Sequence, residues 1–200
     1  MTRPAVFLFS GHMIDARGRS EARFPPHRES LAATAIDGAL TDFGAVADDV
    51  GITEGACGGD LLFAENMLRR AARLELHLPF PEEEFVRRSV AFEKSGDTDN
   101  WRERFWAVRR HPRVRVHVMP EELGPLPKGA DPYERCNIWM IQEALDSAGE
   151  DPVRFIALWD GGRGDGPGGT AQMMEEVKRH GGQTRWLNTR ALWPAPRAGH

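Results

Sequence analysis

The sequence is poor in several features that mark particular classes of protein. Only two of its 200 residues are cysteines, which is too few for a disulfide framework, and their spacing is not that of zinc ligands. No apolar run approaches the roughly 18 residues that a helix needs to cross a bilayer. Positive charge is not in excess either, since 26 Lys and Arg face 30 Asp and Glu and the net charge is −4. We therefore expect no membrane segment, no metal ligand set and no bound cofactor.

The charge balance also bears on partners. A protein that binds the nucleic-acid backbone without sequence preference usually has a basic face and a high pI. This sequence has a pI of about 6.0, so nucleic acid is disfavoured as a partner. The first four residues lead directly into an apolar segment, and we expect no secretory leader. The expected location is cytoplasmic.

The length fits one domain, which we place at residues 1–190, followed by a loosely ordered tail at 191–200. Short apolar segments alternate with longer amphipathic ones, a pattern typical of a parallel sheet. The predicted strands are 5–9, 51–54, 74–78, 113–118, 153–159 and 184–187. The predicted helical segments are 30–43, 60–73, 82–110, 133–148 and 171–180, with a proline-rich connection at 119–132. We predict a Rossmann-like, doubly wound α/β fold with a mainly parallel sheet and helices on both faces. The strict alternation of 113–118 favours an edge strand.

Glycine is concentrated rather than scattered. Ten of the 21 glycines lie within 51–59 and 161–169, and both stretches follow a predicted strand. In doubly wound sheets ligands bind outside the carboxyl ends of the strands, where the strand order reverses. Both stretches, and Ser10-Gly11-His12 after the first strand, are thus predicted to lie on one rim.

The first glycine loop is Gly55-Ala-Cys-Gly-Gly-Asp60, between a strand and a helix. Glycines let a backbone approach a ligand closely, and a helix N-terminus behind them suits a phosphate. Asp60 is either the N-cap of that helix or a ligand to ribose hydroxyls. A capped turn with no ligand is an equal alternative, because neither a Walker A motif nor Gly-x-Gly-x-x-Gly is present.

The second loop, Asp160 to Thr170, is the more specific signal. It follows the most apolar strand and opens a helix that Thr170 can cap. The amides of Gly168, Gly169 and Thr170 are predicted to form an anion cradle. Other candidate ligand contacts are Ser10 and His12 after the first strand, and Tyr133, Arg135 and Asn137 at the start of a helix. An ordinary turn explains Ser10-Gly11-His12 equally well.

Three segments together resemble the SLOG superfamily. They are Gly55-Ala-Cys-Gly-Gly-Asp-Leu-Leu-Phe-Ala-Glu65, His77-Leu-Pro-Phe-Pro-Glu-Glu-Glu-Phe85 and Asp165-Gly-Pro-Gly-Gly-Thr170. This superfamily of Rossmann-like domains includes the lonely-guy phosphoribohydrolases, the lysine-decarboxylase-like proteins and the DNA-processing protein DprA. The similarity covers most of the chain, from Val6 to about Asn188, and is closest to bacterial domains that are often joined to signalling modules.

The resemblance implies binding of a nucleotide or a nucleotide derivative, including an NAD-derived molecule, at the glycine loops. The residues implied or suggested as ligand contacts are Ser10, Gly11, His12, Gly55, Gly58, Gly59, Asp60, Tyr133, Asn137, Asp165, Gly166, Gly168, Gly169 and Thr170. Relatives often form dimers, and the apolar middle helices are candidates for that contact.

The enzymatic members carry Pro-Gly-Gly-x-Gly-Thr with a glutamate soon after it. Here Pro167-Gly-Gly-Thr170 lacks the additional x-Gly, and the first carboxylates on the helix are Glu175 and Glu176. Because these glutamates lie further along the helix, their carboxyl groups point in a different direction from that of the enzymatic members, which weakens the case for catalysis. We therefore predict a sensor domain, with a nucleoside 5′-monophosphate phosphoribohydrolase as the alternative. In that alternative Glu175 or Glu176 stabilises the ribosyl cation and Arg135 holds the substrate.

Overall fold

The computed structural model describes residues 3–92, 98–162 and 169–193. A six-stranded sheet forms its centre, and every pair of neighbouring strands is parallel. The strand order is β4-β3-β2-β1-β5-β6. The strands are β1 (Val6–Gly11), β2 (Val50–Thr53), β3 (Arg73–Leu78), β4 (Val114–Val118), β5 (Arg154–Trp159) and β6 (Gln183–Asn188). The predicted doubly wound α/β fold is confirmed.

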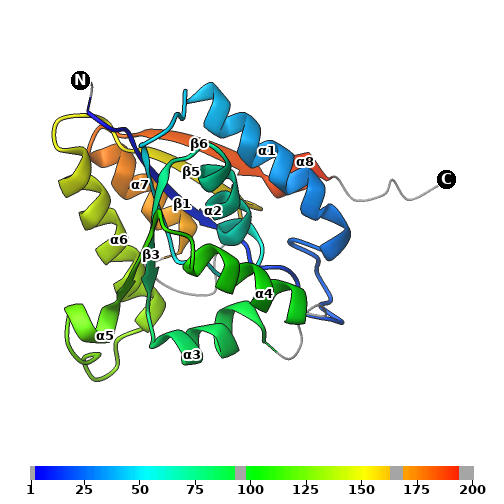
Figure 1. Cartoon of the computed structure of the whole chain (residues 1–200). Coiled ribbons are helices and arrows are strands. Elements are labelled where there is room, and N and C mark those ends of the chain that lie inside the picture. The colour runs from blue at the N-terminus through cyan, green and yellow to red at the C-terminus, as the bar shows by residue number, and fades with distance from the viewer. Residues whose placement is uncertain (1–2, 93–97, 163–168, 194–200) are drawn as a thin grey trace.

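Helices cover both faces of the sheet (Figure 1). They are α1 (Glu29–Asp42), α2 (Gly59–Arg69), α3 (Glu82–Phe85), α4 (Thr98–Arg109), α5 (Met119–Glu122), α6 (Pro132–Ala148), α7 (Thr170–Arg179) and α8 (Thr189–Leu192). A 3₁₀ turn, η1 (Pro26–Arg28), precedes α1, and a π-helical turn, η2 (Val86–Val90), follows α3.

Strand β1 shows how one apolar run supports two cores. Successive side chains of a strand point to opposite faces. Phe7 and Phe9 belong to the core under α1, α2 and α4, whereas Val6 and Leu8 belong to the core under α6 and α7. All four side chains are buried, which is why the run reads as continuously apolar.

The strand order places the topological switch point between β1 and β5. Strands β2, β3 and β4 follow one another on one side of β1, and β5 then pairs with the other side of β1. The loops after β1 and β5 therefore leave the sheet side by side and diverge to opposite faces. Strand β4 lies at one edge, as its alternating sequence predicts.

Three predicted segments differ from the structure. The helix predicted at 60–73 ends at Arg69, because Ala71 has a positive φ of 57° and cannot continue it. The segment predicted as helical at 82–110 divides into α3, η2 and α4, with 93–97 outside the described residues. The connection predicted at 119–132 contains the short helix α5. Pro120 is compatible with this helix because it lies in the first turn, where its missing N–H group would have no partner within the helix.

The start of the predicted tail, 191–200, packs against the domain. Trp193 is 8% exposed and stacks on Phe24 with ring centroids 5.5 Å apart, so the packed unit extends at least to this residue. The rest of the predicted tail, 194–200, lies outside the described residues. Among the helices that are described, none is both long and apolar enough to cross a membrane.

Candidate functional site at the switch point

A cavity of about 150 Å³ opens beside the carboxyl ends of β1 and β2. Its walls come from the end of β1, the β2–α2 loop, the turn η2 and the first turns of α6, four segments far apart in the sequence. They contribute Phe9, Ser10, Gly11, Met13, Glu54, Ala56, Asp60, Ser89, Tyr133, Asn137 and Met140. The structure thus brings together Ser10, Gly11, Asp60, Tyr133 and Asn137, five of the residues predicted to contact a ligand.

Two buried carboxyl groups line this cavity. Glu54 and Asp60 are only 8% and 7% exposed. Burial raises the pKa of Asp60 to about 7, although the amide of Ala56, which donates to its Oδ2 at 3.2 Å, acts in the opposite direction. Burial, and next the charge of Asp60, raise the pKa of Glu54 well above its usual value. Strongly shifted carboxyl groups in a cleft are typical of functional sites.

Sequence reasoning did not single out Glu54. It follows the last residue of β2 and directly precedes Gly55, so it lies at the carboxyl end of a strand whose residues are all buried. An acidic residue at that position is the signal that identifies it, because the ends of parallel strands line the ligand crevice.

Tyr133 supplies a hydroxyl group on the α6 side of the cavity. Its Oη lies 2.9 Å from Ser89 Oγ, and its ring packs edge-on against Phe80. Burial raises the pKa of Tyr133, and the contact with Ser89 opposes that shift. The phenol is therefore neutral near pH 7 and can donate a hydrogen bond to a ligand.

The β2–α2 loop was predicted to present backbone amides to a phosphate, and several of its amides are already bound. The amides of Cys57 and Gly59 donate to the carbonyl oxygens of Ser89 and His12, at 2.9 and 3.1 Å. The amide of Ala56 donates to Asp60. These donors bind the loop to its neighbours and are not available to a phosphate.

The glycines of this loop serve close packing. Gly58 has φ of 95°, forms a bridge to Met13, and a Cβ there would lie 2.6 Å from the amide nitrogen of Ile14. A Cβ on Gly59 would lie 3.1 Å from the Phe9 ring, and one on Gly55 would lie 3.1 Å from Leu76. Gly58, not Asp60, occupies the N-cap position of α2, so the N-cap alternative for Asp60 is wrong. The loop instead holds the Asp60 carboxyl at the cavity.

Two contacts join the loop after β1 to the β5–α7 connection. Ser10 Oγ lies 2.9 Å from Thr170 Oγ1. His12 Nε2 accepts a hydrogen bond from the amide of Asp160 at 3.1 Å and lies 3.2 Å from its Oδ1. Burial and then the charge of Arg23 lower the pKa of His12, although Asp160 opposes them. The neutral imidazole is the form that can accept this hydrogen bond.

Only the two ends of the β5–α7 connection are described. Gly169 takes the extended N-cap conformation before α7, and no side chain caps it. Thr170 is therefore the first residue of the helix and not its cap, and its hydroxyl group faces Ser10. Asp165, Gly166 and Gly168 lie outside the described residues, so their predicted roles stay predictions.

The residues named for the enzymatic alternative do not line the cavity. The guanidinium of Arg135 donates to the carbonyl oxygens of Leu123, Gly124 and Pro125, at 2.7 to 3.1 Å, and so secures the chain after α5. Glu176 pairs with Arg179 and His180, and it faces a separate groove between α6 and α7. Glu175 is exposed. Because α7 begins at Thr170, both glutamates lie more than one turn further along the helix.

Comparisons with known proteins add little to this geometry. Neither the family models nor the curated proteins give a match. Among solved structures, the chain is similar to DNA processing protein A (DprA) from Streptococcus pneumoniae, at 11% identity and a TM-score of 0.38. That match covers 94% of this chain and 61% of the other, so the chain spans less than two thirds of that protein. The SLOG resemblance therefore stays a prediction, and the fold class rests on the strand order and pairing.

Proposed function

We propose that the cavity beside the carboxyl ends of β1 and β2 binds a nucleotide or a nucleotide derivative, and that the domain acts as a sensor of this ligand. The main support for this proposal is that two buried carboxyl groups, those of Glu54 and Asp60, line an open cavity. Burying a carboxyl group beside another one destabilises a folded protein unless hydrogen bonds compensate for the loss of water and for the repulsion between the two groups. A ligand rich in hydroxyl or amino groups donates such hydrogen bonds to both.

The position of the cavity suggests how the ligand lies. About 150 Å³ is below the usual size of a pocket for a whole drug-sized ligand, so the cavity accommodates one part of the molecule. We place a ribose or base edge against Glu54, Asp60 and Tyr133. The remainder extends past Ser10 towards Thr170, where the N-terminus of the ten-residue helix α7 favours a phosphate.

A thermal-shift screen tests the binding proposal. The full chain is heated with adenosine, AMP, ADP, ADP-ribose, NAD and the guanine counterparts. A ligand that binds the folded state at 100 times its Kd stabilises that state by about 2.7 kcal/mol, which raises the melting temperature by several degrees. We expect such a shift for at least one nucleotide. No shift with any compound at millimolar concentration would contradict the proposal.

Matched variants locate the ligand. Asp60→Asn and Glu54→Gln keep the size of each side chain and replace its carboxyl group by an amide, and both are expected to abolish most of the shift. Glu176→Gln makes the same chemical change in the groove between α6 and α7, outside the cavity. If Glu176→Gln reduces binding as much as Asp60→Asn does, the ligand does not occupy the cavity.

A second candidate is hydrolysis of the N-glycosidic bond of a nucleoside 5′-monophosphate. It is favoured by the pKa of about 7 at Asp60, because an acid or base is most effective when its pKa is near the working pH. In this version the carboxyl groups of Asp60 and Glu54 take the roles first assigned to Glu175 and Glu176. Incubation with AMP, with free adenine followed by chromatography, distinguishes the candidates. A sensor releases no adenine, whereas an enzyme releases adenine and loses this activity in Asp60→Asn.

A further inference from the structure

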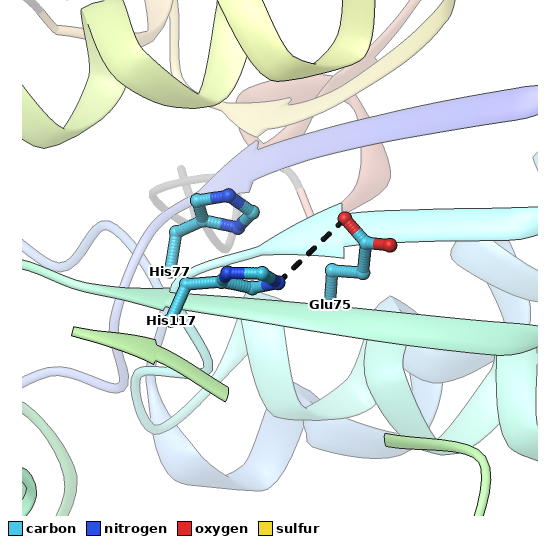
Figure 2. A group of neighbouring side chains, drawn as sticks. All are labelled: Glu75, His77 and His117. Carbon is cyan, nitrogen blue, oxygen red and sulfur yellow. Dashed lines mark ion pairs between the residues drawn. The ribbon is translucent and has the colours of Figure 1, made fainter. Parts of the chain in front are cut away.

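Strands β3 and β4 bring three metal-ligating side chains together near the edge of the sheet. His77 and His117 are register partners across the two strands, and Glu75 precedes His77 by two residues, on the same face. Figure 2 shows the two imidazoles beside each other, with the Glu75 carboxylate next to the His117 ring. One ligand atom from each side chain lies within 4.8 Å of the other two.

His77 is a buried polar group whose ring nitrogens are both without a partner. Its side chain is 0% exposed, and neither Nδ1 nor Nε2 has a hydrogen bond. The ring stacks on His117 with centroids 4.7 Å apart and contacts the edge of Trp139 at 4.5 Å. Such an unsatisfied group costs stability and calls for an explanation, of which a bound ion is one.

His117 is held in the orientation of a metal ligand. Its Nδ1 lies 2.9 Å from Oε1 of Glu122, and because a carboxylate only accepts, Nδ1 is the donor. Its Nε2 faces Oε2 of Glu75 at 3.9 Å and has no hydrogen bond. The 3.9 Å between Nε2 and Oε2 matches two ligand atoms that bind one cation from either side. Histidines that bind metals usually donate their other ring nitrogen to a carboxylate in the same manner.

We propose that Glu75, His77 and His117 form a binding site for a divalent transition-metal ion of the Zn²⁺ class, with Glu122 orienting His117. Two imidazoles and one carboxylate are a common zinc ligand set, and a water completes the tetrahedron. Ligand atoms about 2.1 Å from one ion are at most about 4.2 Å apart, so small side-chain rotations close the site. Glu75 and His117 are 22% and 25% exposed, which leaves a path for the ion. None of the three lines the cavity, so this proposal stands or fails independently of the proposed function.

Calorimetric titration of the untagged full chain with Zn²⁺, after treatment with a chelator, tests the site. We expect one saturable site per chain. Glu75→Gln and His117→Gln remove one ligand each and are expected to weaken Zn²⁺ binding by at least about 100-fold, and Glu122→Gln by roughly 10-fold. Co²⁺ in place of Zn²⁺ is expected to give the visible absorption of a tetrahedral site, and this absorption is expected to disappear in His117→Gln.

The control is His180→Gln. His180 also lies beside a carboxylate, with Nε2 3.0 Å from Glu176, but it is an exposed residue at the C-cap of α7, and no second histidine among the described residues hydrogen-bonds to it or stacks on it. We expect this variant to bind Zn²⁺ like the unmodified chain. The proposal is overturned if the folded chain binds no Zn²⁺ at micromolar concentration, which would leave His117 and Glu75 as an ion pair only. It is equally overturned if the Glu75 and His117 variants, shown to be folded by circular dichroism, bind Zn²⁺ unchanged.

Discussion

The two glycine-rich connections of this molecule, after β2 and after β5, look alike in the sequence and differ in the structure. In the β2–α2 loop the amides of Ala56, Cys57 and Gly59 all donate to groups of the protein itself. At the described start and end of the β5–α7 connection, side chains near the end of β1 take part in the contacts. The His12 imidazole accepts from the Asp160 amide, and Ser10 Oγ lies beside Thr170 Oγ1. The first loop is bound through its own backbone amides, whereas the second is joined to β1 through the imidazole of His12 and the hydroxyl group of Ser10.

A pair of glycines between a strand and a helix is thus not by itself a phosphate site. Gly58 and Gly59 allow the loop to pack directly against the backbone of His12 and Ile14. That packing fixes Asp60 at the cavity. Substitutions of the glycines in the first loop should therefore act on stability, whereas substitutions of Asp60 and of residues around the second connection should act on ligand affinity.

The largest effect is expected for Gly58→Ala. A Cβ at φ of 95° is strained, and it would lie 2.6 Å from the amide nitrogen of Ile14. We expect a loss of about 3 kcal/mol or more in the free energy of unfolding, measured by urea denaturation. Gly44→Ala is the control, because Gly44 also has a positive φ, of 72°, but open space around it. It should lose only about 1–2 kcal/mol. Equal losses in the two variants would show that the clash is unimportant.

Asp60→Asn should change the pH dependence of stability. The pKa of Asp60 is about 7 in the folded protein, against 3.8 for an ordinary aspartate such as that of an unfolded chain. The folded state thus binds more protons between these values, and its contribution to stability is present below about pH 4 and is lost as the pH rises through 7. We expect the unfolding free energy of the unmodified chain to fall by roughly 2–3 kcal/mol from pH 5 to pH 8 through this group. The Asn variant should lose that slope, and an unchanged slope would contradict the burial of an ionisable Asp60.

Thr170→Val is expected to have a moderate effect, mainly on ligand binding. It keeps the shape of the side chain and removes the hydroxyl group that contacts Ser10. The loss of this partly buried hydrogen bond should cost about 1 kcal/mol of stability. Nucleotide affinity, measured by calorimetry, should fall by roughly 10-fold because a donor near the phosphate is lost. A larger effect on the unfolding free energy than on nucleotide affinity would show that Thr170 serves packing and does not contact the ligand.

The smallest effects are expected on α7 itself. Glu175→Ala changes an exposed side chain, and Glu176→Gln weakens surface pairs with Arg179 and His180. Each should alter the unfolding free energy by less than about 1 kcal/mol. Neither should change nucleotide affinity by more than about 2-fold. A large loss of ligand binding or turnover in Glu175→Ala would instead show that the ligand lies at α7, as the enzymatic alternative first assumed.

The fold was largely predictable because each strand or helix is indicated by a sequence pattern within its own residues. The continuous apolar run at Val6–Phe9 is typical of a strand buried on both faces, and the alternation at Val114–Val118 favours an edge strand. Pro120 misled the prediction because proline is compatible with a first helical turn as well as with a loop.

The site was predictable only in part because it depends on distant contacts. Ser10, Asp60 and Tyr133 were predicted as ligand contacts from their places after strands or at helix starts, and they line the same cavity. Glu54 was missed because a single acid at a strand end has no spacing motif. Whether the amides of Cys57 and Gly59 are free depends on Ser89 and His12, which no local pattern relates to them.

The most direct measurement of the central claim is the calorimetric Kd of the strongest ligand found in the nucleotide screen, for the unmodified chain, Asp60→Asn and Glu176→Gln. At pH 8, where Asp60 with its pKa of about 7 is ionised, we expect Asp60→Asn to weaken binding at least about 10-fold, since a hydrogen bond to a charged group contributes roughly 1.5–3 kcal/mol. We expect Glu176→Gln to leave Kd unchanged. Equal affinity in all three proteins would show that the buried carboxyl groups do not contact the ligand, and the proposed site would be wrong.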